Sequence, residues 1–387
     1  MPVFLTEDSF MVAKGCRSKG WSLLVTTLAT AAFLLGGCNG GGSDGSAGAT
    51  GATGATGPAG PAGKDAVATV KVSTLSDEAW TNLSPKGEVT KVTISSPPVI
   101  EFKVTDANGN PVVGLGNMRK RSTDVVPGYL NLGFTIAKLV PGTNGSPSRW
   151  VSYVVTSTPT TTAAAAPSKP TTDSTGTLVD NGDGSYKYTF YRDITKVKAD
   201  VAAMTVTAPN DKADLGDLTY EPNLTHRVVV QVYGNKFGTG SNTADGSASG
   251  VTAVAMANPL NLFYDFIPAT GKTVTAADSQ RDIVATANCN ECHNQIGVTT
   301  PHGGRVDTRF CVTCHNDQRK YGTVEATATA TGYSGATVRI NGFAVGDFPN
   351  LIHKTHMGNN LTKTGYNYPN TNTVAGAAYT CTALGGA

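Results

Sequence analysis

Two pentapeptides of the form Cys-x-x-Cys-His constrain this chain more than any other feature. They are Cys289-Asn-Glu-Cys292-His293 and Cys311-Val-Thr-Cys314-His315. Two thiols at this spacing can form thioethers with the two vinyl groups of one porphyrin, and the histidine that follows can ligate the iron. The motifs therefore predict two covalently attached c-type haems, with the four cysteines as thioether residues and the two histidines as proximal iron ligands.

The same cysteines allow a second interpretation, a structural zinc site made of four thiolates. Such a site has no use for a histidine directly after each cysteine pair. Five of the chain's six histidines also fall within one window, residues 293–356, and a tetrathiolate site would leave all five unused. Haem is therefore favoured over zinc.

Each haem iron needs a sixth ligand, and three histidines outside the motifs are candidates. His302 lies between the two motifs, whereas His353 and His356 follow both of them. The last two are spaced i, i+3, so on a helical turn they project to neighbouring sides and could serve different haems. Met357 is a competing ligand. Three candidate histidines for two irons leave one in surplus.

The N-terminus is typical of an exported bacterial lipoprotein. A positively charged region precedes the apolar stretch Trp21 to Leu35, and Leu-Gly-Gly-Cys38 then matches a lipobox. This pattern predicts that residues 1–37 are a signal peptide and that Cys38 is lipidated. The alternatives are a plain signal peptide or a transmembrane helix, although the apolar stretch is short for a span.

Glycine-rich sequence separates this segment from the rest of the chain. Residues 38–65 begin with Gly and Ser and continue as Gly-X-Y triplets. We interpret them as an extended tether between the lipid and the folded part, with a collagen-like trimer stem as the alternative.

Residues 66–270 have the pattern of a β-protein. Runs rich in Val, Ile, Thr, Tyr and Phe recur between turns that contain Gly and Asn. The expected fold is mainly β, a Greek-key sandwich or a split β-barrel, with no catalytic constellation. His226 opens one of these runs and is interpreted as structural. The net charge of +2 gives no indication of nucleic-acid binding.

The remaining residues, 271–387, contain the haem motifs and few long apolar runs. A segment of this size cannot bury an ordinary core, so we expect a small module organised by haem, with short helices and little regular secondary structure. Arg305 and Arg309 are weaker candidates for pairing with the haem propionates.

The sequence resembles the OmcA/MtrC-type outer-membrane decahaem cytochromes. Besides the lipobox and the tether, the resemblance is carried by Asp106–Leu115, Thr135–Gly142, Gly176–Gly184, Tyr264–Gly271, Arg281–His293, His302–Asn316 and Asp347–Gly358. It implies an N-terminal β-domain followed by a multihaem module with bis-histidine haems. It also implies a lipid-anchored position at the outer membrane, facing the cell exterior. Electrons would come from a periplasmic cytochrome through a porin and pass to extracellular metal oxides or flavins.

The chain departs from that family in having two haem motifs rather than about ten. Cys381 could be the first cysteine of a lost third motif, which would make the haem module incomplete at its C-terminus, or it could be an incidental thiol. The surplus histidine would then ligate a haem beyond the end of this chain.

We expect an electron-transfer protein rather than a classical enzyme, with terminal metal-reductase activity left open. The alternatives are a multihaem reductase of a small molecule and a surface β-domain lipoprotein with a vestigial haem segment. An open iron coordination position would indicate the reductase, and absence of attached haem would indicate the vestigial segment.

Overall fold

The computed structural model describes residues 68–275, 283–298, 303–329, 332–334 and 338–357, together with Gly51 and Gly54. The chain divides into two compact units, residues 1–63 and 64–387, and the elements named below belong to the second. The predicted signal peptide, the lipidation residue Cys38, most of the tether, His302 and Cys381 lie outside the described residues.

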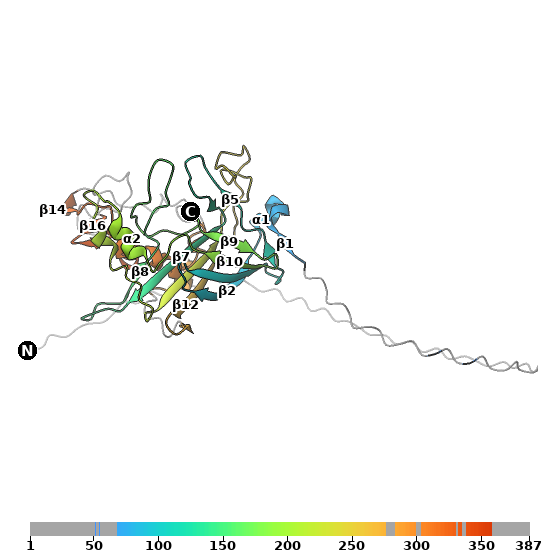
Figure 1. Cartoon of the computed structure of the whole chain (residues 1–387), viewed down its shortest axis with the longest axis horizontal. Helices are drawn as coiled ribbons and strands as arrows, with labels where there is room; N and C mark the ends of the chain where they lie inside the picture. The colour runs from blue at the N-terminus through green and yellow to red at the C-terminus, as the bar shows by residue number, and fades with distance from the viewer. Residues whose placement is uncertain are drawn as a thin grey trace, which may run out of the picture. The chain divides into compact units, whose positions relative to one another are not determined.

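The larger of two main sheets is antiparallel and has the order β13-β12-β11-β7-β8. Its strands are β13 (Lys272–Thr273), β12 (Leu260–Ile267), β11 (His226–Val232), β7 (Leu132–Val140) and β8 (Arg149–Ser152). β11 and β7 are the inner strands, and β8 is an edge strand. The order places β11 beside two strands that are far from each other in the sequence (Figure 1).

The smaller sheet is also antiparallel, with the order β2-β3-β10-β9. Its strands are β2 (Lys86–Thr93), β3 (Val99–Thr105), β10 (Ser185–Thr189) and β9 (Thr177–Asp180). Aromatic side chains join the two sheets: Phe134 of β7 stacks on Tyr188 of β10 with ring centroids 3.5 Å apart, and it meets Phe102 of β3 edge-on at 5.8 Å. Such pairs add specific geometry to the burial of large apolar area. The two sheets therefore form a sandwich around one core.

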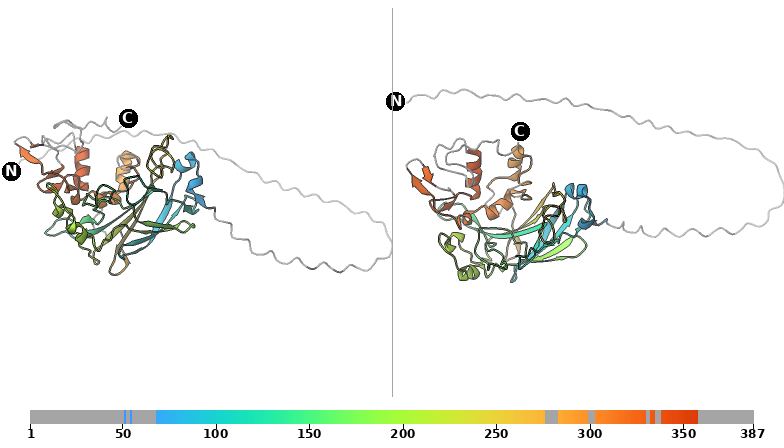
Figure 2. Two further views of the ribbon diagram at one scale, coloured as in Figure 1. Left: turned by 45° about the horizontal axis from the view of Figure 1, so that its top comes forward. Right: turned by 90° about the horizontal axis from the view of Figure 1, so that it is seen from above.

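The inner strands of the larger sheet are buried on both faces. All seven residues of β11 and eight of the nine in β7 are buried. One face of β7 packs into the sandwich core through Phe134 and Ile136. On the other face, Ala137 and Leu139 form a second apolar cluster with residues from the haem segment. We call this second surface the outer face of the larger sheet; the segment that covers it is orange to red in Figure 2.

The other elements are short. The helices are α1 (Asp77–Thr81), α2 (Val197–Ala203), α3 (Thr286–His293), α4 (Thr308–Cys314) and α5 (Phe348–Met357). The 3₁₀ turns are η1 (Val72–Thr74), η2 (Lys212–Leu215) and η3 (Asp317–Lys320).

Four two-stranded pairs complete the described secondary structure. They are β1 (Val70–Lys71) with β4 (Val112–Val113), β5 (Met118–Arg119) with β6 (Gly128–Tyr129), β14 (Thr327–Thr329) with β15 (Gly332–Ser334), and β16 (Arg339–Ile340) with β17 (Phe343–Ala344).

The predicted fold class is confirmed: a mainly β part precedes a segment of short helices with little other regular structure. Of the two β architectures left open by the sequence, the described strands form the sandwich. Within the described ranges, no helix has the length and apolar character needed to cross a membrane.

Candidate haem-attachment site

The second Cys-x-x-Cys-His motif lies on α4, a helix fixed at its N-terminus by Asp307. The Asp307 carboxylate accepts a hydrogen bond from Arg309 N at 2.8 Å, which caps the helix. Cys311 and Cys314 are one helical turn apart, as two thioethers to one porphyrin require. His315 leaves the helix immediately afterwards, and its backbone N–H still bonds to the Cys311 carbonyl at 2.7 Å.

The His315 imidazole is oriented by the backbone of a distant loop. Its Nδ1 lies 3.0 Å from the Gly346 carbonyl oxygen, and a carbonyl can only accept. The proton is therefore on Nδ1, so Nε2 carries the lone pair with which imidazole binds a metal. This arrangement suits an iron ligand.

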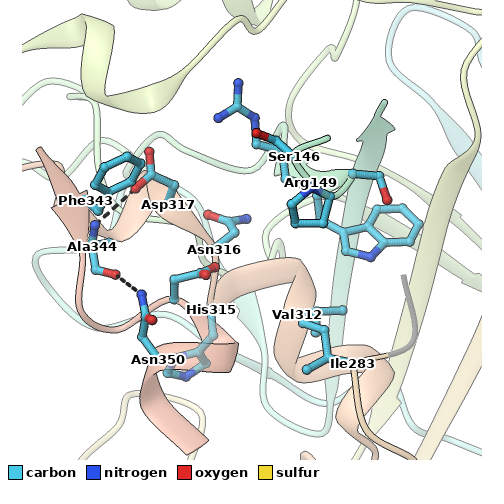
Figure 3. Close-up of a pocket in the computed structure, with 14 residues that line it drawn as sticks. Ser146, Arg149, Ile283, Val312, His315, Asn316, Asp317, Phe343, Ala344 and Asn350 are labelled. Atoms are coloured by element: carbon cyan, nitrogen blue, oxygen red, sulfur yellow. Dashed lines mark hydrogen bonds between the residues drawn. The ribbon is translucent and has the colours of Figure 1, made fainter. Parts of the chain in front are cut away.

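A cavity of about 240 Å³ lies beside His315 (Figure 3). Its apolar wall includes Trp150, Val312 and Ile283, and its polar rim includes Arg149 and Asp317. An apolar wall with a charged rim is the kind of surface that a porphyrin with propionates needs.

The first motif lies on α3, which has no buried residue. Cys289 is half-buried and Cys292 is exposed. The Thr286 hydroxyl joins this helix to α4: it lies 3.0 Å from the Thr308 hydroxyl and accepts a hydrogen bond from Thr308 N at 2.9 Å. The two motifs thus lie on neighbouring helices, one exposed and one packed against the sheet.

Helix α5 places one candidate distal histidine beside the first motif. The rings of His293 and His356 have centroids 6.1 Å apart and planes at 78°. His356 Nδ1 lies 2.9 Å from the Ile352 carbonyl oxygen, so it too donates from Nδ1 and keeps the lone pair on Nε2. His353 is exposed on the same helix.

Burial raises the pKa values of the thiols in the second motif. It raises the pKa of the Cys311 thiol to about 12, with the Cys314 and Asp307 charges adding to the rise. Burial also raises the pKa values of the Cys314 and Cys289 thiols. Across the part of the chain that the structure describes, no three His, Cys, Asp or Glu side chains are grouped to hold a metal ion.

The two arginines suggested as propionate partners have protein contacts. Arg309 pairs with Asp307 at 2.8 Å and lies over the Phe263 ring at 4.1 Å. Arg305 lies over the Phe310 ring at 5.4 Å. Met357 ends α5, and its side chain is outside the described residues.

Polar residues on the outer face of the larger sheet hold the segment that leads into α4, and the sequence did not predict these contacts. Asn261 donates from its amide to the Gly304 carbonyl at 2.8 Å and accepts from Val306 N at 2.9 Å. Arg227 donates to the Arg309 carbonyl at 3.3 Å. One sequence signal could have indicated these contacts. Polar residues recur on one face of β11 and of β12, although the other residues of these strands are mostly apolar.

Comparisons with known proteins found similarity to outer-membrane cytochromes. Residues 281–383 match the family model described as outer membrane cytochrome MtrC/MtrF-like, domains II/IV. The chain is 30% identical over 218 residues to the multiheme cytochrome MtrC of Shewanella baltica (strain OS185). That alignment covers 56% of this chain and 25% of the relative, so the chain spans about a quarter of the relative's length.

Two solved structures also show similarity. The crystal structure of MtrC from Shewanella baltica OS185 has a TM-score of 0.40 and 23% identity, over 70% of this chain and 32% of that one. The outer membrane decaheme cytochrome OmcA has a TM-score of 0.42 and 22% identity, over 75% of this chain and 34% of that one.

Proposed function

We propose that this chain, which is similar to MtrC/MtrF-like outer-membrane cytochromes, is an electron-transfer protein with one haem c at each Cys-x-x-Cys-His motif. Cys289 and Cys292 hold the first haem, with His293 as the proximal iron ligand. Cys311 and Cys314 hold the second haem, with His315 as its proximal ligand. Bound haem iron supplies a one-electron cycle between Fe(III) and Fe(II).

The spacing of His293 and His356 carries the proposal. These residues are far apart in the sequence, yet their ring centroids are 6.1 Å apart. A metal bound about 2 Å from one nitrogen of each of two facing imidazoles separates the ring centroids by roughly 6 Å. The pair therefore has the separation of two axial ligands of one iron. We propose that His356 is the distal ligand of the first haem.

His293 and His356 would together hold the first haem iron, and an iron held by two histidines would favour electron transfer over binding of a small substrate. His302 and His353 remain candidates for the distal position of the second haem. The protein's part in transfer is to hold the two haems at a short fixed separation, through the packing of α4 and α5 against the sheet. Under this proposal the chain is a local two-haem relay.

We further propose that Cys38 carries lipid and anchors the chain at the outer membrane, facing outward through the 38–65 tether. The domain assignment is then a signal peptide at 1–37, a β-domain at 66–270 and a haem module at 271–387. A periplasmic cytochrome in complex with a porin would donate the electrons. Extracellular metal oxides or flavins would accept them.

Covalent haem counting tests the proposal directly. The protein is expressed with a c-type haem maturation system, separated on a denaturing gel and stained for haem. We expect two haems per chain, one after Cys289→Ala/Cys292→Ala, one after Cys311→Ala/Cys314→Ala, and two after the control Cys381→Ala. An unstained wild-type band would refute the proposal and favour the vestigial haem segment. Zinc in place of haem would establish the alternative metal site.

Electron transfer is tested on the haem-loaded protein. After reduction it is mixed with a flavin or with Fe(III) oxide particles, and the return of the oxidised absorption spectrum is followed. We expect reoxidation in both cases. Reduced protein that stays reduced with either acceptor would remove them from the proposal.

A further inference from the structure

Gln318 connects the haem segment to the edge of the larger sheet. Its amide oxygen accepts from Ser152 N at 2.7 Å, and its amide nitrogen donates to Ser152 O at 3.0 Å. Ser152 is the last residue of the edge strand β8. The side-chain amide thus pairs with the edge of β8 as the backbone of a neighbouring strand would, with one donated and one accepted hydrogen bond.

The same side chain also binds a third segment. Its amide nitrogen donates to the Leu215 carbonyl at 2.9 Å, at the end of η2. Gln318 is 3% exposed, so its removal would leave buried backbone groups of Ser152 and Leu215 without this partner. Buried polar groups that lose their hydrogen bonds are costly, which makes this contact a strong constraint on the position of η3.

Backbone and side-chain bonds carry this constraint to the second haem motif. Gln318 N donates to the Asn316 side-chain oxygen at 3.0 Å, and the Asn316 amide donates to the Thr313 carbonyl at 3.2 Å. Thr313 and Asn316 lie on either side of His315 in the sequence. The His315 backbone is also bound to α5, because its carbonyl accepts a hydrogen bond from Phe348 N at 2.9 Å.

From this network we infer that Gln318 is a positioning residue for the haem ligand His315. By holding η3 against the edge of β8, it fixes the direction in which the His315 imidazole leaves α4. The inference rests on the proposed function, since it assumes a haem at the second motif. Groups that orient a metal-bound histidine tune the electronic properties of the metal.

A matched pair of substitutions tests this role. Gln318→Met removes all three side-chain hydrogen bonds and keeps a side chain of similar length. Gln231→Met is the control: Gln231 is also buried on the outer face of the larger sheet and donates to the haem segment, at the Gly303 carbonyl, 3.3 Å away. Both are made in the Cys289→Ala/Cys292→Ala background, so that the second haem alone gives the signal.

Two readouts separate positioning from stability: the electron paramagnetic resonance g-values of the oxidised haem and its reduction potential. We expect Gln318→Met to shift the g-values and to change the oxidised-to-reduced ratio at fixed potential by at least threefold, about 28 mV for a one-electron couple. Gln231→Met should leave both readouts at the parent values.

Gln318→Glu provides a second variant of nearly unchanged volume. Its carboxylate keeps the acceptor for Ser152 N and loses both donated bonds, so it should shift the same readouts in the same direction. Parent g-values and potential in haem-loaded Gln318→Met or Gln318→Glu would overturn the inference. A background protein that carries no haem would instead refute haem attachment at the second motif.

Discussion

The ion pair on the outer face of the larger sheet is far more buried than the ion pairs at the surface, so removal of one partner leaves a charge that water cannot easily solvate. The Arg227 side chain is 2% exposed and bonds Asp265 through two nitrogens, at 2.8 and 2.7 Å. Its guanidinium also lies over the Trp150 ring at 4.5 Å. By contrast, Lys91 and Glu101 form a pair at 3.8 Å with side chains 64% and 44% exposed. Solvent screens such a pair strongly.

We therefore predict that Arg227→Met lowers the free energy of unfolding by about 3 kcal/mol or more, because Asp265 is left as an unpaired, largely buried charge. Arg227→Lys should restore little, since an ammonium cannot form the two parallel bonds. Urea unfolding measures the change. Lys91→Met is the control, with an expected change below about 0.5 kcal/mol. Similar losses of unfolding free energy for Arg227→Met and Lys91→Met would contradict the prediction.

His226 is a buried titratable group that sets a pH dependence. It lies in the sandwich interior, with Nδ1 donating to the Leu224 carbonyl at 2.8 Å and Nε2 3.2 Å from the Tyr153 hydroxyl. Burial lowers its pKa from 6.5 to about 4. Between these values the unfolded chain binds the proton and the folded chain does not. His226 therefore favours the folded state fully above pH 6.5, and this contribution is lost as the pH falls from 6.5 to 4.

The predicted size of this effect is about 3 kcal/mol, from the difference between the two pKa values. Urea unfolding from pH 7.5 to pH 4 should show the loss in the wild-type protein. His226→Gln cannot titrate, so its stability should fall less over the same range. Identical pH profiles for the two proteins would show that His226 does not contribute.

Under the proposed function, helices α3 and α5 together determine whether the first haem has two protein ligands. The α3 helix has no buried residue, whereas α5 packs Phe348, Leu351 and Ile352 against the second apolar cluster. The position of α5 is thus set by the sheet, and α5 in turn presents His356 to His293. The sheet contributes to the first haem site through this helix.

We predict that His356→Ala opens a coordination position on the first haem. In the Cys311→Ala/Cys314→Ala background, the reduced variant should bind one equivalent of carbon monoxide, seen as a shift of its absorption spectrum. Thr355→Ala on the same helix is the control and should bind none. His353→Ala should also bind none in this background. Carbon monoxide binding by His353→Ala but not by His356→Ala would reverse the assignment.

The β-sandwich and the haem segment depend on each other for burial. Within residues 64–387, β7 and β11 are covered by the smaller sheet on one face and by residues of α4 and α5 on the other. The outer face contains Ala137, Leu139 and Trp150, all buried in the complete unit. A sheet buried on both faces needs apolar strands, which explains the continuous valine run of β11.

Truncation after residue 275 should therefore destabilise the sandwich, since it exposes the outer face to water. We expect a loss of several kcal/mol in the free energy of unfolding, or self-association through the exposed apolar face. Urea unfolding and size-exclusion chromatography measure the two outcomes. Deletion of residues 1–63 is the control and should leave stability unchanged. A truncated sandwich as stable and monomeric as the longer protein would contradict this dependence.

Local sequence patterns were sufficient for the strands and the haem motifs. Strands β2, β3, β10 and β11 lie close to four runs rich in β-branched and aromatic residues, at 89–94, 99–105, 186–191 and 227–233. The role of polar residues within those strands was not predictable in the same way. Arg227, Gln231 and Asn261 contact a segment that follows them by tens of residues, and no local periodicity encodes such partners.

The sequence by itself carries the prediction of haem attachment, because two thiols and an imidazole within five consecutive residues need only a helical turn to meet one porphyrin. It also determined the fold class, through side-chain alternation along each strand. Only the tertiary structure decided that His356 lies beside His293 and that Gln318 binds the edge of β8. These contacts join residues 63 and 166 positions apart, so they depend on how the sheet and helices pack.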